Sequence, residues 1–148
     1  MTAPQSIQRA PGIPSTPPAE PAPLVFWVPL PGYSMNDLYE ILWFQKRTQL
    51  KPAARVWKFK FKQAIRKPVP VPWTAQTKFR LAFDFHDQWY FKNGDYRELD
   101  VQNLVKLATD ALAEALGFRD RQVWCDGPHW KIQSPDQVGI RATVWMLS

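Results

Sequence analysis

The sequence is poor in the residues from which disulfides and zinc sites are built. Its 148 residues include one cysteine, Cys125, so an internal disulfide and a cysteine-based zinc cluster are both excluded. A lone thiol fits a reducing cytoplasm, where we expect the protein, and Cys125 itself is expected to be a buried strand residue. The two histidines, His86 and His129, have no partner at metal-ligand spacing, and we expect them to be structural.

Long apolar runs are also missing. The longest, around residues 24–31, is far shorter than the roughly 20 residues that a membrane helix needs, so we expect no membrane span. Residues 1–23 hold seven of the fifteen prolines and few large apolar side chains. This composition is unlike a signal peptide and predicts a disordered or extended tail, with a partner-binding proline motif as the alternative.

Acidic residues are absent from residues 46–67, although this segment holds nine Lys or Arg. Such a dense run of one sign, in a chain of net charge +6, predicts contact with the phosphates of a nucleic-acid backbone. A solvated helix face is the alternative. The predicted contact residues are Lys46, Arg47, Lys51, Arg55, Lys58, Lys60, Lys62, Arg66 and Lys67.

Residues 24–148 are apolar enough to form one domain, since hydrophobic residues make up 45% of the chain. Alternating apolar residues predict a half-buried strand over Phe79–His86. Further strands are predicted over Leu24–Leu30, Gln122–Trp124, His129–Gln133 and Ile140–Met146, and helices over Asn36–Gln49, Lys51–Lys67 and Val101–Leu116. The fold class is therefore α+β: a mixed, mostly antiparallel sheet with helices packed on one face.

The most informative stretch is Arg97–Val123, RELDVQNLVKLATDALAEALGFRDRQV. Asp100 stands at the N-cap of the predicted helix, where its side chain can accept a free backbone N–H, worth roughly 1 kcal/mol. Gly117 stands where a left-handed turn ends a helix. Residues at helical spacing predict a packed apolar face, formed by Leu104, Leu107, Ala108, Ala111, Leu112 and Ala115.

Polar residues share another face of this helix. Asn103, Lys106 and Asp110 are three and four residues apart, so they are neighbours on its surface. Taken singly, each acid has an ordinary explanation. Asp100 is more often a cap than a ligand, Asp110 is more often a surface charge, and Asp120 is an ordinary loop acid. Their joint spacing is what raises the interest of the segment.

Together these residues resemble the core motif of the RusA family of Holliday junction resolvases. That family reads D-x-D-N-x-x-K, then D-A-L, a Gly-containing turn, and D-D-x-Q-V. The chain aligns with this pattern without a gap, although Gln102 and Arg119 stand where the family has Asp. The residues at the motif spacings are Asp100, Gln102, Asn103, Lys106, Asp110, Ala111, Leu112, Gly117, Asp120, Gln122 and Val123. More loosely, residues 31–36 resemble the family's P-P-S-x-N loop, which lies near the active site. An ordinary turn with Asn36 as a helix N-cap is an equal alternative.

The resemblance implies a RusA-like nuclease domain over residues 24–148. It implies a homodimeric, Mg²⁺-dependent endodeoxyribonuclease that cuts four-way DNA junctions in recombination and repair, with Mn²⁺ as a substitute. By position, Asp100 and Asp120 would bind the metal, Lys106 would stabilise charge on the phosphate, and Asn103 and Asn36 would support the site. A two-fold dimer suits two symmetric cuts, and the apolar helix stripe or exposed tryptophans would contribute to its interface.

One departure from the family pattern bears on activity. Gln102 replaces the second Asp of D-x-D-N, so it offers a carbonyl oxygen to the metal but no charge, and a unit charge at 4 Å is worth on the order of 4 kcal/mol at an effective dielectric near 20. Glu98 could supply the missing carboxylate if its loop bends inward. Otherwise the chain binds branched DNA without cutting it, or it is a basic structural protein with a chance motif.

Asp100 and Asp120 also lie near opposite ends of a helix roughly 24 Å long, so they meet only if the chain doubles back or a second subunit helps.

Overall fold

The computed structural model describes residues 22–35, 39–42 and 47–147, and for residues 39–42 and 47 it describes the backbone alone. Most of the predicted tail therefore lies outside the described residues. Asn36 and Lys46, two of the predicted functional residues, lie outside them as well.

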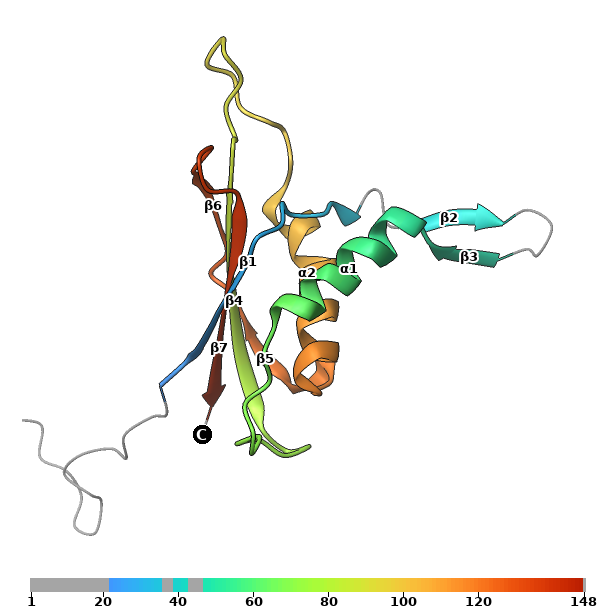
Figure 1. Cartoon of the computed structure of the whole chain (residues 1–148), viewed down its shortest axis with the longest axis vertical. Coiled ribbons are helices and arrows are strands. Elements are labelled where there is room, and N and C mark those ends of the chain that lie inside the picture. The colour runs from blue at the N-terminus through green and yellow to red at the C-terminus, as the bar shows by residue number, and fades with distance from the viewer. Residues whose placement is uncertain (1–21, 36–38, 43–46, 148) are drawn as a thin grey trace, which may run out of the picture.

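The described strands form one mixed sheet with a separate hairpin (Figure 1). The sheet consists of β1 (Leu24–Val28), β4 (Lys78–Asp87), β5 (Val123–Asp126), β6 (Trp130–Gln133) and β7 (Gly139–Leu147). Its order is β1-β7-β4-β5, and β6 also pairs with β4. The long pairs β1–β7 and β7–β4 are antiparallel, whereas the short β5 and β6 run parallel to β4. This confirms the predicted fold class of α+β with a mixed, mostly antiparallel sheet.

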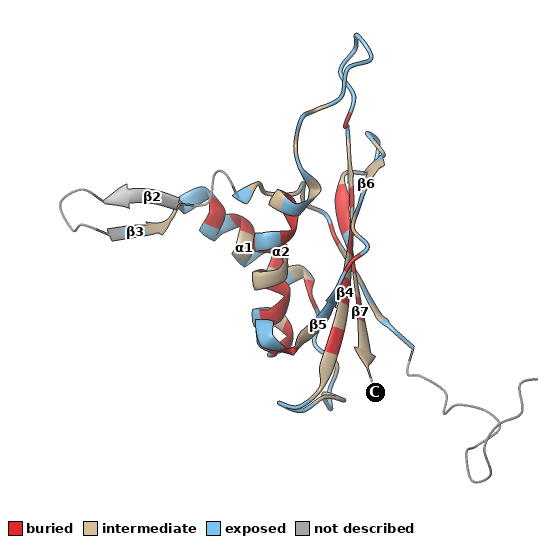
Figure 2. Ribbon diagram, turned by 180° about the vertical axis from the view of Figure 1, so that it is seen from behind, coloured by how far each residue is buried: buried red, intermediate tan, exposed pale blue. Residues whose placement is uncertain are grey.

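Both helices, α1 (Pro52–Ala64) and α2 (Val101–Leu116), lie on the same face of this sheet (Figures 1 and 2). Every second side chain of β4 is buried beneath them, as the alternating sequence predicts. These residues are Phe79, Leu81, Phe83 and Phe85, and their β7 partners are Met146, Val144, Ala142 and Ile140. On the opposite face, which no described element covers, Val25 and Trp130 are exposed.

Helix α2 begins and ends where its sequence predicts. Asp100 Oδ1 accepts a hydrogen bond from the Gln102 backbone N–H at 3.1 Å, and Gly117 adopts a left-handed conformation with φ of 80°. The predicted apolar face packs into the core, with Ala115 alone half-buried. The apolar face is therefore buried inside the subunit, so the prediction that it contributes to a dimer interface is wrong.

Helix α1 confirms the helix predicted within residues 51–67. Pro52 lies in its first turn, where a missing N–H costs nothing. Ala54, Trp57 and Phe61 are buried at helical spacing, and Trp57 Nε1 donates to the Pro31 carbonyl at 2.7 Å. Phe59 is exposed, so the alternation of aromatic and lysine residues here does not reflect a strand.

Two other predictions are wrong. Residues 36–49 were predicted as a helix, but Tyr39–Leu42 (β2) and Arg47–Leu50 (β3) pair as antiparallel strands. Tyr, Ile and Thr favour extended backbone, and the strand pairing satisfies backbone groups that a short helix would leave free. Cys125 is exposed rather than buried, because the register places it beside Arg80, on the face away from the helices.

Within the described part of the chain, no helix combines the length and apolar character needed to cross a membrane.

Candidate functional site

The chain doubles back within one subunit after α2. Gly117 and Phe118 both donate their backbone N–H to the Ala113 carbonyl, which turns the chain sharply at the end of the helix. A short 3-10 helix, η3 (Asp120–Gln122), then leads into β5, which runs beside β4 under α2 (Figure 1). We call η3 and β5 together the return segment.

The return segment and α2 enclose a pocket of about 260 Å³, the acidic pocket. Asp120 and Asp126 line it from the return segment, and Gln102, Lys106 and Asp110 line it from α2. The remaining lining residues are Met35, Val105 and Thr109. The structure thus brings together Gln102, Lys106 and Asp120, three of the residues predicted from the motif, and adds two further carboxylates.

Asp110 has an altered ionisation in this pocket. Burial of its carboxyl raises its pKa, the Lys106 ammonium opposes this, and the nearby Asp120 carboxylate raises the pKa further. The net shift of the Asp110 pKa is upward, so the charged form of this carboxyl is disfavoured unless a metal cation binds beside it. Sequence reasoning left Asp110 out of the site as a surface charge. Its spacing of four residues from Lys106, itself four from Gln102, was the signal that places all three on one helix face.

Asp126 is held in place by a buried histidine. The ring of His129, with 1% of its side chain exposed, stacks on Phe83. His129 Nδ1 accepts the Phe83 backbone N–H at 3.0 Å, so its proton is carried on Nε2, which donates to Asp126 Oδ1 at 2.6 Å. One Asp126 oxygen is therefore anchored by the ring while its side chain stays 53% exposed. The sequence offered only a weak signal for this pair, an Asp three residues before a His.

The second histidine has no such arrangement. His86 lies on the uncovered face of the sheet, with its ring edge-on to Trp27 at 5.2 Å between centroids. Its Nε2 atom is buried and has no hydrogen-bond partner among the residues that the structure describes.

The remaining predicted metal residues lie outside the acidic pocket. Asp100 is exposed, with Oδ1 engaged as the N-cap of α2. Glu98 lines a different pocket, together with Phe91, Asp95 and Tyr96. Asn103 is half-buried on α2. Neither Asp100 nor Glu98 is among the residues that line the acidic pocket.

Two lysines of the predicted basic segment form ion pairs within the protein. Lys58 Nζ lies 2.7 Å from Glu114 Oε1, and Lys62 Nζ lies 3.2 Å from Glu114 Oε2. Burial alone would raise the pKa of Glu114, but the hydrogen bonds and charges of the two lysines outweigh it and lower that pKa. Among the residues of the segment whose side chains the structure describes, the exposed cations are Arg55, Lys60, Arg66 and Lys67.

The donors of the acidic pocket suit a hard divalent cation in their chemistry, because carboxylate and amide oxygens are the ligands that Mg²⁺ prefers. Within the described ranges, however, no three side chains of His, Cys, Asp or Glu form a group arranged to hold a metal ion. A cation that binds here would therefore have to draw the carboxylates together, and in doing so it would relieve the repulsion between Asp110 and Asp120.

No protein-family model matches the chain, and the search of curated proteins likewise gives no match. The likeness to the RusA motif therefore depends on the spacing of the residues alone.

Proposed function

We propose that the protein is a RusA-like, metal-dependent endonuclease that acts on branched DNA such as four-way junctions. One observation carries this proposal: the return segment brings Asp120 and Asp126 to the face of α2 that presents Gln102, Lys106 and Asp110. Carboxylates beside a lysine suit phosphodiester hydrolysis. The carboxylates can hold a cation, while the lysine ammonium neutralises negative charge on the phosphate.

Each residue of the acidic pocket has a role in this proposal. Asp110, Asp120 and Asp126 would hold the cation, and the Gln102 carbonyl would add a neutral ligand. Asp126 would supply the charge that Gln102 lacks, in place of Glu98. When bound, Mg²⁺ or Mn²⁺ would activate a water molecule and neutralise charge on the scissile phosphate.

Residues around the cation support the same chemistry. The exposed ammonium of Lys106 would stabilise negative charge on a phosphate oxygen. The Nε2–H group of His129 would orient Asp126 toward the pocket, as hydrogen bonds to ligating carboxylates do elsewhere. Asp100, which the motif assigns to the metal, would act as the cap of α2. The exposed cations of α1 and its C-terminal flank would contact phosphates.

A homodimer belongs to the proposal, because two symmetric cuts need two related sites. The uncovered face of the sheet, with exposed Trp130 and Val25, is the surface proposed for the contact. Light scattering coupled to size-exclusion chromatography tests this point: the proposal expects twice the mass of the chain, and a monomer at all concentrations would exclude it.

A second candidate function is favoured by Gln102 and by the open arrangement of the carboxylates. In this alternative, the protein binds branched DNA but does not cut it, since a site that has lost one charge holds the cation too weakly. The predicted cleavage would then be absent while junction binding persists.

Cleavage of a labelled four-way junction, with Mg²⁺ and with Mn²⁺, separates these functions. The endonuclease proposal expects paired symmetric nicks that disappear in Asp120→Asn and persist in Asp136→Asn, a matched change in an exposed turn. Tight binding without nicks, with nicks appearing in Gln102→Asp, would support the binding protein instead. Absence of both binding and cleavage would rule out both functions.

A further inference from the structure

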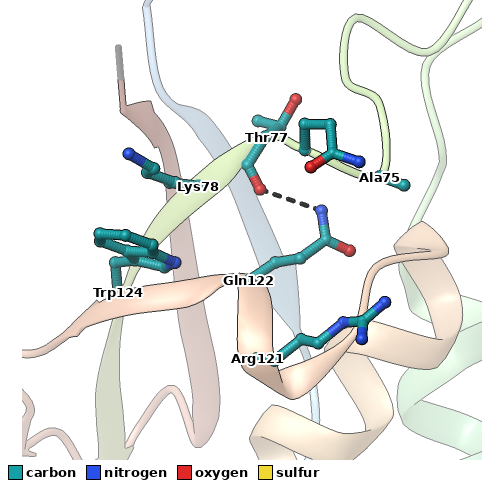
Figure 3. Close-up of a pocket in the computed structure, with 7 residues that line it drawn as sticks. Ala75, Thr77, Lys78, Arg121, Gln122 and Trp124 are labelled. Carbon is teal, nitrogen blue, oxygen red and sulfur yellow. Dashed lines mark hydrogen bonds between the residues drawn. The ribbon is translucent and has the colours of Figure 1, made fainter.

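A second concave surface lies on the other side of the return segment. Two adjoining pockets share the lining residues Ala75, Arg121 and Gln122, and we call them together the basic groove. Figure 3 shows the first of them, with Lys78 and Trp124 on one side of Gln122 and Arg121 on the other. Four cationic residues line the groove, Lys67, Lys78, Arg119 and Arg121, and none of the described lining residues is acidic.

The groove is built on a fixed floor. Gln122 is 7% exposed, and its Nε2 donates to the Thr77 carbonyl at 2.9 Å (Figure 3). The same Nε2 donates to the Thr74 carbonyl at 3.1 Å. Its Oε1 accepts the backbone N–H of Arg119 at 3.0 Å. The first two hydrogen bonds join the loop before β4 to the return segment, and the third holds the Gln122 side chain against the residue that precedes η3.

An exposed aromatic ring stands beside the cations. Trp124 is 66% exposed, although tryptophan is usually well buried on average. The Lys78 ammonium lies 4.1 Å from the centre of its ring and so restricts the orientation of both side chains (Figure 3). A cationic groove that also contains an accessible aromatic ring is the arrangement that binds single-stranded nucleic acid, through phosphates and stacked bases.

The basic groove and the acidic pocket share one segment of chain. Asp120 and Asp126 line the acidic pocket, whereas Arg121 and Trp124, which lie between them in the sequence, line the groove. The return segment therefore separates two surfaces of opposite charge. A polyanion held in the groove would be next to the carboxylates without having to contact them.

We propose that the basic groove binds a single strand of DNA, with phosphates on Lys78 and Arg121 and one base stacked on Trp124. The strand would thereby be led from the groove toward the acidic pocket. Only this last step rests on the endonuclease proposed above, because binding in the groove needs neither a metal nor cleavage.

Fluorescence anisotropy in EDTA tests the stacking. The probes are a labelled oligothymidine of about 12 nucleotides and an abasic strand of the same length and charge. The protein is expected to bind the thymidine strand on the order of tenfold more tightly. Trp124→Ala removes this preference, Trp124→Phe keeps most of it, and Tyr96→Ala, a change of an exposed aromatic residue in the loop before α2, leaves it intact. Equal binding of the two probes by the unaltered protein would overturn the proposal.

The salt dependence of the same binding tests the phosphate contacts. Arg121→Gln is expected to weaken both probes and to lower the slope of log affinity against log salt by about one. Lys92→Gln, which removes an exposed cation from a distant loop, is the control and leaves the slope unchanged. An Arg121→Gln slope equal to that of the unaltered protein would contradict the assignment.

These measurements fail independently of the proposed endonuclease. Loss of junction cleavage with intact preference for the thymidine strand would remove the endonuclease and keep the groove. Junction cleavage together with equal binding of the two probes would remove the groove proposal and keep the endonuclease.

Discussion

His129 is buried because each of its ring nitrogens has a partner inside the molecule. Nδ1 accepts from the Phe83 backbone, and Nε2 donates to Asp126. These two contacts fix the tautomer and orientation of the ring and leave one Asp126 oxygen free to bind a ligand. The sequence predicts a structural histidine at this position, and the structure places its ring beside a residue that lines the acidic pocket.

We predict that His129→Phe weakens Mn²⁺ binding by about tenfold to a hundredfold, because Asp126 loses the donor that orients it. Isothermal titration with Mn²⁺ measures the change, and circular dichroism confirms that the variant is folded. His86→Phe is the matched control on the other face of the sheet. Equal affinity in His129→Phe and the unaltered protein would show that the ring does not position a ligand.

The raised pKa of Asp110 gives a second prediction at this scale. Its charged form is disfavoured in the folded state, so the stability cost is absent in acid and develops as the pH rises from about 3.8, the ordinary value, through the raised pKa. Asp110→Asn is therefore expected to unfold at a higher denaturant concentration than the unaltered protein at pH 7, without divalent cations, and to lose this advantage near pH 3.

Saturating Mn²⁺ at pH 7 should make the unaltered protein more stable than Asp110→Asn, because only the unaltered protein gains the full binding free energy of the cation. Denaturant titrations with and without Mn²⁺ measure both effects. If the metal stabilises Asp110→Asn as much as the unaltered protein, Asp110 is not a ligand.

Asp100 precedes the first residue of α2. The family motif assigns it to the metal site, whereas in the structure it caps the helix. We predict that Asp100→Ala lowers the free energy of unfolding by about 1 kcal/mol, whereas Asp100→Asn, which can still cap the helix, leaves it nearly unchanged. Mn²⁺ affinity of Asp100→Asn should stay near that of the unaltered protein, because Asp100 does not line the acidic pocket. A large loss of Mn²⁺ affinity in Asp100→Asn would restore Asp100 to the metal site.

The contact between α1 and α2 provides a prediction with the opposite dependence on pH. Lys58 and Lys62 lower the pKa of Glu114, so their stabilisation is present above its ordinary value of 4.5 and is lost as the pH falls through the lowered pKa. Glu114 is about half exposed, and solvent screening limits the effect to about 1 kcal/mol at most. Glu114→Gln should be less stable at pH 7 and equal to the unaltered protein near pH 2, as measured by denaturant titration. A difference that persists unchanged in acid would mean that the charge of Glu114 is not its cause.

Local patterns predicted the elements whose signals lie within a few residues. The alternation in β4, the cap at Asp100 and the turn at Gly117 each depend on neighbours in the sequence, and each was predicted. The β2–β3 hairpin was missed because short segments of mixed apolar and polar residues fit helix and strand alike. Asp126 was missed because it joins the site only through pairing of β5 with β4, far apart in the sequence.

Across the described part of the molecule, cations gather on α1 and along the basic groove, whereas three carboxylates line the acidic pocket on α2 and the return segment. Such a distribution attracts a polyanion at long range and presents it to a local group of acids. Of the three acids of the pocket, the motif predicted only Asp120 as a site residue, and the position of the groove beside them follows only from the fold.

Junction cleavage by Asp126→Asn, alone and combined with Gln102→Asp, is the most direct test of the central claim that the return segment completes a metal site. Asp126→Asn should abolish the symmetric nicks, and the double variant should recover part of them, because Gln102→Asp returns a carboxylate to the same pocket. Cleavage by Asp126→Asn at the rate of the unaltered protein would contradict the account.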